Sequence, residues 1–203
     1  MSEGSAGRGR REGYGPEPRD VYLTVPNLIS VLRIISIPFI AALIAGHDMA
    51  PALVVLGLSA VSDGVDGIIA RRFDQVSRIG QILDPLADRL LIFCSILALG
   101  IAGIIPWWML LVVGLRDCLM ATQILVLAQH DYGPLPVHFV GKSGTALLMT
   151  SIVTLIIADL WPDPFGTVLH VISLSIFIWG IALYWLAGLL YAWQGYALLR
   201  RRG

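Results

Sequence analysis

The sequence has little charge and little cysteine. Only 14% of its 203 residues are charged, whereas 57% are hydrophobic, and the mean hydropathy is +0.79. Soluble domains usually carry about 25% charged residues, so this scarcity argues against a soluble domain and predicts an integral membrane protein. The only two cysteines, Cys94 and Cys118, fit no metal-binding or redox spacing. We therefore expect neither a thiolate metal site nor a redox centre.

Apolar residues gather in runs long enough to cross a bilayer. A transmembrane helix needs roughly 20 mostly apolar residues, and six segments meet that need: 28–45, 51–70, 80–105, 107–128, 141–160 and 168–199. We predict an all-α integral membrane fold of six transmembrane helices, in one domain over residues 21–203. Residues 1–20 are rich in Gly, Pro, Arg and Glu, which predicts a flexible tail. The tail does not resemble a signal peptide, so we expect the first helix to remain as an anchor.

The loop cations predict the orientation in the membrane. Three alternate connections, near His47, Gly103 and Asp163, contain no Lys or Arg. The cations lie on the other side: Arg8, Arg10, Arg11, Arg19, Arg71, Arg72, Arg78, Lys142, Arg200, Arg201 and Arg202. By the positive-inside rule, that side and both termini face the cytoplasm. We expect a multi-pass protein of the plasma membrane.

Four aspartates border the second and third apolar segments. Asp63 and Asp66 are three residues apart, and Asp84 and Asp88 are four apart, so each pair shares one helix face. The short connection between the segments lets the helices run antiparallel and the two faces meet. Four carboxylates repel one another unless a cation neutralises them, and all-oxygen ligation suits Mg²⁺ or Mn²⁺. We predict two ions, roughly 3.5–4 Å apart as in two-metal sites, at the cytoplasmic ends of helices 2 and 3.

Residues around the aspartates suggest what the metal site acts on. Gly64 and Gly67 remove side chains beside the carboxylates, so a ligand can come close. Arg71 can bind a phosphate with two hydrogen bonds, and Ser77 adds another donor. This set predicts a site for a diphosphate whose lipid tail stays in the bilayer. The alternative is that the aspartates cap helices, pair with arginines or line an ion pathway.

The motif from Asp63 to Asp88 reads D-x-x-D-G-x-x-A-R-x8-G-x3-D-x3-D. It resembles the signature of the CDP-alcohol phosphatidyltransferases, and "VPNLISVLR" (25–33) resembles the opening segment of that family. The resemblance implies that all four aspartates hold metal, that Asp88 is also the general base, and that the enzyme is a homodimer. It further implies a binding site for the CDP part of CDP-diacylglycerol at Pro26, Asn27, Leu28, Gly67, Arg71 and Ser77. The reaction would be attack by an acceptor hydroxyl on the β-phosphorus of this donor, with release of CMP.

The acceptor is predicted from two cations. Arg116 lies inside the fourth apolar segment and Lys142 opens the fifth. A charge inside the membrane costs roughly 2.5–3.5 kcal/mol on insertion scales and should face the bundle interior or a wet cavity. We predict that Arg116 and Lys142 bind an anionic acceptor. The alternative for Arg116 is a structural pair with Asp117 or another helix.

Other segments resemble particular branches of the family. "GKSGTALLM" (141–149) and "LRD" (115–117) resemble the glycerol-type branch, which includes phosphatidylglycerophosphate synthases. "DPLADR" (84–89) and "IPWW" (105–108) resemble actinobacterial cardiolipin synthases. The expected acceptors are sn-glycerol-3-phosphate or phosphatidylglycerol, and we expect no nucleic-acid partner. Three alternatives stay open: an inositol phosphate acceptor, a cation transporter that uses the intramembrane aspartates, and a prenyltransferase with aspartate-rich helices.

Overall fold

Every secondary-structure element in the described part of the chain is a helix. A computed structural model describes residues 25–72, 78–129, 139–161 and 163–200, with side chains for 31–62, 86–125, 140–161 and 163–195. The helices are α1 (Val25–Ala45), α2 (Met49–Arg72), α3 (Arg78–Ile101), α4 (Trp107–Gln129), α5 (Phe139–Asp159) and α6 (Pro164–Arg200). The predicted all-α architecture of six helices is confirmed for these residues. The predicted tail, residues 1–20, lies outside them.

Three helices have the length and hydropathy of membrane spans within the described residues: Trp107–Leu125, Val140–Asp159 and Pro164–Gly195. Shorter apolar stretches occupy Val31–Ala45 and Met49–Ser62. Large apolar side chains are exposed along the helices, including Leu111, Trp179, Leu189 and Trp193. Such a surface is typical of contact with lipid rather than water. The fold is that of a membrane protein.

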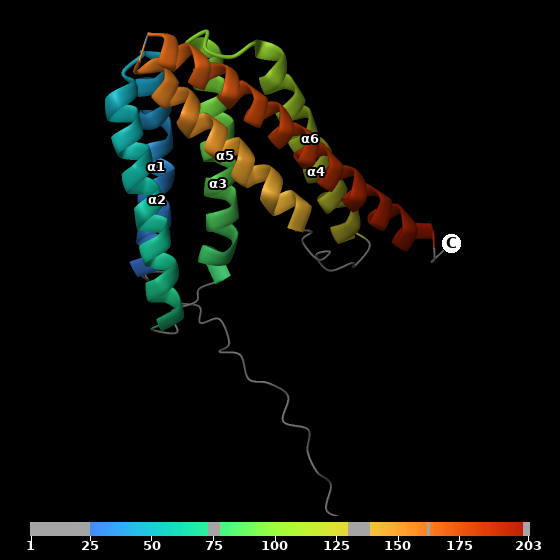
Figure 1. Cartoon of the computed structure of the whole chain (residues 1–203). Coiled ribbons are helices and arrows are strands. Elements are labelled where there is room, and N and C mark those ends of the chain that lie inside the picture. The colour runs from blue at the N-terminus through green and yellow to red at the C-terminus, as the bar shows by residue number, and fades with distance from the viewer. Residues whose placement is uncertain (1–24, 73–77, 130–138, 162, 201–203) are drawn as a thin grey trace, which may run out of the picture.

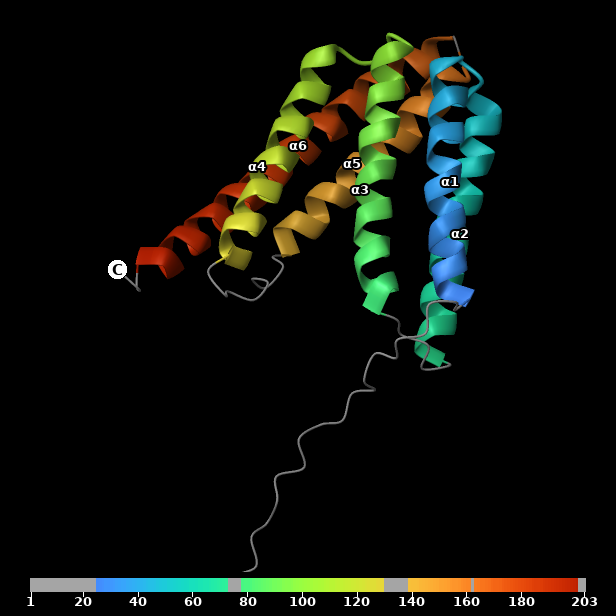
Figure 2. The same ribbon diagram turned by 180° about the vertical axis from the view of Figure 1, so that it is seen from behind.

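The helices form two groups that meet along α3 and α5. Helix α1 packs against both α2 and α3, whereas α5 packs mainly against α6 and also contacts α2 and α3. Helix α4 contacts α3 and α6. Successive helices alternate in direction, so the connections after α1, α3 and α5 gather at one end of the bundle (Figures 1 and 2). The start of α1, the end of α2 and the start of α3 lie together at the opposite end (Figure 1).

Local signals explain where helices begin and end. Gly103, just after α3, has a φ of +73°, the left-handed conformation that glycine adopts without strain and that often ends helices. His47 has a φ of 61° after α1. Helix α6 begins with Pro164 in its first position, and the Oδ1 atom of Asp163 accepts a hydrogen bond of 3.1 Å from the backbone N–H of Gly166. These are the usual features of a capped helix start.

The tightest packing joins α5 to α6. A Cβ atom on Gly144 would lie 2.9 Å from the backbone nitrogen of Tyr184, and one on Gly180 would lie 3.1 Å from that of Leu148. Glycine at position 144 therefore lets the two backbones come this close, and a side chain at position 180 would press on Leu148. The largest fully buried apolar side chains come from α1, α3, α4, α5 and α6: Ile40, Ile44, Ile96, Leu99, Val113, Leu148, Ile152, Leu155, Ile156 and Phe177.

Candidate functional site

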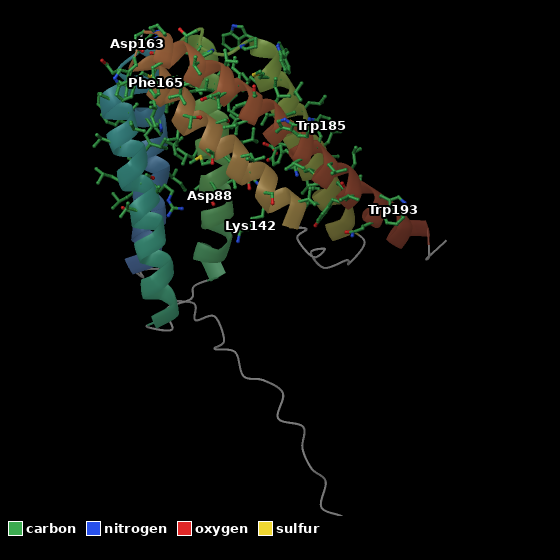
Figure 3. All side chains as sticks on the ribbon, viewed as in Figure 1. Asp88, Lys142, Asp163, Phe165, Trp185 and Trp193 are labelled. Carbon is green, nitrogen blue, oxygen red and sulfur yellow. The ribbon has the colours of Figure 1, made fainter. Side chains whose placement is uncertain are left out.

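A cavity of about 520 Å³ lies between α1, α2, α3 and α5. Its polar lining combines one carboxylate with three cations: Asp88 and Arg89 from α3, Arg33 from α1 and Lys142 from α5. Asp88 and Lys142 approach it from different helices (Figure 3). Its other lining residues are Ser59, Ala60, Leu91, Ile92, Thr145, Ala146 and Met149. Helix packing therefore brings together two residues predicted from the sequence, Asp88 and Lys142.

Asp88 pairs with a buried arginine, and its side chain is largely exposed. Its side chain is 62% exposed, and its Oδ1 atom lies 3.5 Å from Nη1 of Arg33, whose side chain is only 3% exposed. Buried arginines are stable only when charge partners and hydrogen bonds offset desolvation. Arg33 therefore orients the Asp88 carboxylate while most of that side chain stays accessible to a ligand.

The other three predicted metal ligands are placed by their backbones alone. Asp63 and Asp66 belong to the second half of α2, and Asp84 to the first third of α3. Because these helices run antiparallel, the half of α2 that holds Asp63 and Asp66 and the half of α3 that holds Asp84 and Asp88 point to the same end of the bundle (Figure 1). Among the residues with described side chains, no group of three or more His, Cys, Asp or Glu could hold a metal. The donor set of four carboxylates nevertheless has the chemistry that a hard divalent cation requires.

The predicted CDP-binding residues are spread over two helix ends. Pro26, Asn27 and Leu28 lie in the first turn of α1, and Gly67 and Arg71 in the last two turns of α2. These two helix ends lie at the same end of the bundle (Figure 1). Their side chains are outside the described set. Ser77 lies outside the described residues altogether.

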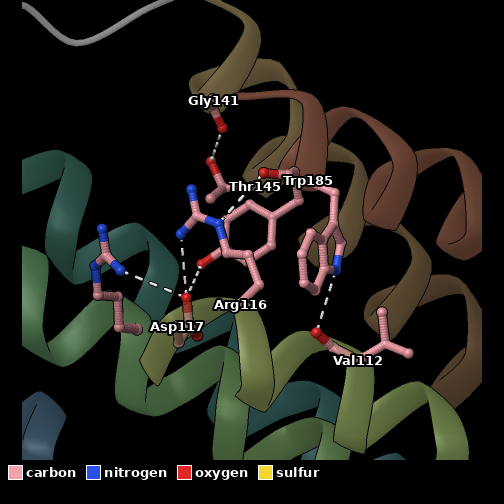
Figure 4. Close-up of polar contacts among 8 residues, drawn as sticks. Val112, Arg116, Asp117, Gly141, Thr145 and Trp185 are labelled. Carbon is pink, nitrogen blue, oxygen red and sulfur yellow. Dashed lines mark hydrogen bonds and ion pairs between the residues drawn. The ribbon is translucent and has the colours of Figure 1, made fainter. Parts of the chain in front are cut away.

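Arg116 is engaged by its own helix and by α6. Its Nε atom donates to the carbonyl of Tyr184 over 3.3 Å, and its guanidinium lies 3.7 Å from the centre of the Tyr184 ring. Its Nη1 atom pairs with Oδ1 of Asp117 at 3.1 Å. The side chain is only 6% exposed, and it is not among the described residues that line the cavity. This geometry (Figure 4) corresponds to the structural alternative for Arg116, and its binding of an acceptor stays a prediction.

Asp117 connects this buried group to the cavity. The Tyr184 hydroxyl donates to Asp117 Oδ1 over 2.6 Å, and Nη1 of Arg89 lies 3.5 Å from the same oxygen. Arg89 is half exposed and lines the cavity. Helices α3, α4 and α6 thus share one polar junction (Figure 4).

Sequence reasoning missed part of this site. Arg33 and Arg89 were recognisable as cations near the membrane, but no spacing rule pairs Arg33 with Asp88 across 55 positions (88 − 33). Ser59 lies one helical turn before Asp63, so its place near the site could have been found from the i, i+4 rule. Tyr184 carries no such signal, because its partner Asp117 lies on another helix.

The chain is similar to one protein family and to several known proteins. The family model described as CDP-alcohol phosphatidyltransferase matches residues 23–191. A Streptomyces coelicolor protein named "Cardiolipin synthase (CMP-forming)" is 36% identical over 187 residues, covering 89% of this chain and 86% of that protein. Two further similar proteins come from Mycobacterium tuberculosis. One, named "Putative cardiolipin synthase", is 37% identical over 181 residues, covering 88% of this chain and 86% of its own. The other, named "Probable phosphatidylglycerophosphate synthase", is 28% identical over 171 residues, covering 81% and 78%.

Proposed function

Because the chain belongs to the CDP-alcohol phosphatidyltransferase family, we propose that it transfers the phosphatidyl group of CDP-diacylglycerol to a glycerol-type acceptor, releasing CMP. One observation carries the proposal most strongly. Asp88, the last aspartate of the family motif, lines a cavity together with three cations. A carboxylate that can take a proton and cations that can hold an anionic alcohol are what this transfer requires.

We propose phosphatidylglycerol as the acceptor and cardiolipin as the product. Within one organism, Mycobacterium tuberculosis, the relative named for cardiolipin synthesis is 37% identical and the relative named for phosphatidylglycerophosphate synthesis is 28% identical. The Streptomyces coelicolor relative is also named for cardiolipin synthesis. The second candidate acceptor is sn-glycerol-3-phosphate. Like phosphatidylglycerol it has a glycerol hydroxyl that can react, but its phosphate is a monoester rather than a diester.

The four aspartates are proposed to hold two Mg²⁺ or Mn²⁺ ions. Asp63 and Asp66 would contribute from α2, and Asp84 and Asp88 from α3. Bound metal would supply positive charge that stabilises the diphosphate of the donor as the bond to CMP breaks. Pro26, Asn27, Leu28, Gly67, Arg71 and Ser77 would bind the CDP part of the donor.

The residues of the cavity have separate proposed roles. Asp88 accepts the proton of the acceptor hydroxyl as its oxygen bonds to the β-phosphorus, and the bonding electrons leave with CMP. Arg33 holds the Asp88 carboxylate in position through the 3.5 Å ion pair. Lys142, the only lysine of the chain, binds the anionic part of the acceptor with Arg89. Arg116 does not bind the acceptor in this proposal but holds Asp117, which contacts Arg89.

The setting of the reaction is also proposed. All six helices span the plasma membrane, with both termini and the aspartates on the cytoplasmic side. Support comes from the cation-free connections after α1, α3 and α5, which lie together at the end away from the aspartates (Figure 1). We also expect a homodimer, as the family resemblance implies.

The decisive experiment measures CMP release by the purified protein in lipid nanodiscs. CDP-diacylglycerol and Mg²⁺ or Mn²⁺ are supplied, and phosphatidylglycerol, sn-glycerol-3-phosphate and an inositol phosphate are added in separate reactions. We expect CMP and cardiolipin with phosphatidylglycerol alone, and no CMP after chelation with EDTA until metal is restored. Release with sn-glycerol-3-phosphate alone would reassign the acceptor. No release with any acceptor, accompanied by cation flux in liposomes, would favour the transporter alternative.

A further inference from the structure

The inference concerns Asp117, a carboxylate of α4 that the proposed chemistry does not use directly. Its Oδ1 atom receives three donors from three helices. They are the Tyr184 hydroxyl of α6 at 2.6 Å, Nη1 of Arg116 of α4 at 3.1 Å, and Nη1 of Arg89 of α3 at 3.5 Å. Asp117 is 25% exposed. It is therefore a junction between the buried side of the bundle and the cavity.

Two of the three donors fix the carboxylate in place. Arg116 is 6% exposed and is itself held by the Tyr184 carbonyl and ring. Tyr184 is held in turn, because its backbone lies against Gly144 of α5. Charge-assisted hydrogen bonds are stronger than neutral ones, and both partners here are packed. Asp117 is consequently a rigid anchor rather than a mobile surface group.

The third donor belongs to the cavity. Arg89 is 48% exposed, lines the cavity, and directly follows Asp88. Its contact with Asp117 involves one nitrogen, whereas a guanidinium carries five N–H donors in a fixed plane. Because the guanidinium is planar and rigid, a bond to one of its nitrogens also orients its other N–H groups, at low cost in side-chain entropy. The remaining donors of Arg89 are then available to an anion in the cavity.

We propose that Asp117 is a positioning residue for acceptor binding: it orients Arg89 so that the guanidinium binds the phosphate of the acceptor. The inference rests on the proposed transferase function. It assigns Arg89 the negatively charged phosphodiester or phosphomonoester group of the acceptor. Asp117 is not among the described residues that line the cavity, so its effect on acceptor affinity should pass through Arg89.

The test is a double-mutant cycle with separate apparent KM values for donor and acceptor. Asp117→Asn, Arg89→Ala and the combined variant are assayed for CMP release in nanodiscs. We expect Asp117→Asn to raise the acceptor KM roughly tenfold, as loss of a charged hydrogen bond would, while the donor KM stays near that of the wild type. In the Arg89→Ala background, Asp117→Asn should cause no further rise. Asp117→Glu, which keeps the charge, should restore part of the affinity.

A matched control distinguishes the loss of Arg89 positioning from a general weakening of the contact between α4 and α6. Gln123 also joins α4 to α6, since its Nε2 atom donates to the Tyr191 carbonyl over 2.8 Å, but it is not among the described residues that line the cavity. Gln123→Ala should leave the acceptor KM unchanged. An equal Asp117→Asn effect with and without Arg89 would overturn the proposal. Absence of CMP release from the wild-type protein would instead refute the proposed function itself.

Discussion

At the scale of single residues, Asp88 carries the sharpest prediction. Asp88→Asn keeps the size of the side chain but removes its ability to accept a proton. General bases contribute about 10²–10⁴-fold to rate, so we expect turnover to fall by that factor while donor binding persists. CMP release and binding of CDP-diacylglycerol measure the two effects. Asp48→Asn is the control, because Asp48 is exposed in the connection between α1 and α2. Near-normal turnover of Asp88→Asn would assign the base elsewhere.

The sequence predicts that both Lys142 and Arg116 bind the acceptor and gives a structural alternative for Arg116 only; in the structure the two residues have different surroundings. Lys142 is exposed and lines the cavity, whereas Arg116 is buried against Tyr184. We expect Lys142→Ala to raise the acceptor KM without changing Tm. We expect Arg116→Ala to lower Tm by about 5 °C, because it leaves Asp117 without a partner on its own helix. Thermal unfolding and acceptor KM should be measured for both variants. A selective rise in acceptor KM at unchanged Tm for Arg116→Ala would support its original assignment.

At the scale of helices, the α5–α6 contact depends on Gly144. A Cβ there would meet the Tyr184 backbone at 2.9 and 3.1 Å, and backbone cannot move aside as a flexible side chain can. Overpacking of this kind costs about 1–3 kcal/mol, so we expect Gly144→Ala to lower Tm by several degrees. Gly57→Ala is the matched control, since a Cβ on Gly57 meets nothing within 4 Å. Equal Tm values for the two variants would show that α5 and α6 can separate freely.

At the scale of the whole molecule, orientation in the membrane can be measured directly. Cys94 and Cys118 are replaced by Ala, and a single cysteine is introduced as Asp48→Cys or Arg200→Cys. A membrane-impermeant thiol reagent applied to intact cells should label the first variant and not the second, because loop cations stay in the cytoplasm. Permeabilised cells should label both. The reverse pattern would place the aspartates outside the cell.

Much of the fold could be predicted because lipid imposes a simple rule. A chain in a bilayer must satisfy its backbone hydrogen bonds internally, so long apolar runs become helices. The predicted segment 107–128 nearly coincides with α4, Trp107–Gln129. The two largest differences are four residues each. Helix α3 ends at Ile101 rather than at residue 105, and α6 begins at Pro164 rather than at residue 168. At the start of α6, the Asp163 cap and Pro164 begin the helix earlier than hydropathy alone predicts.

The candidate site could be predicted only where its residues lie on the same or neighbouring helices. Asp63, Asp66, Asp84 and Asp88 are linked by helical periodicity and one short connection, so the motif could be read from spacing. The partners of Arg116 could not be chosen from the sequence. Asp117 was one option among several, and the Tyr184 ring lies 68 positions away (184 − 116).

The sequence by itself therefore determined the helices, the family motif and the asymmetry of the loop cations, because each of these is a local pattern of side-chain chemistry. The tertiary structure decided which cations share a cavity with Asp88. It placed Arg33, Arg89 and Lys142 there and turned Arg116 toward α6. The physical reason is packing. Glycine contacts and ion pairs set how closely helices approach, and those distances select which of several equivalent charges a substrate can reach.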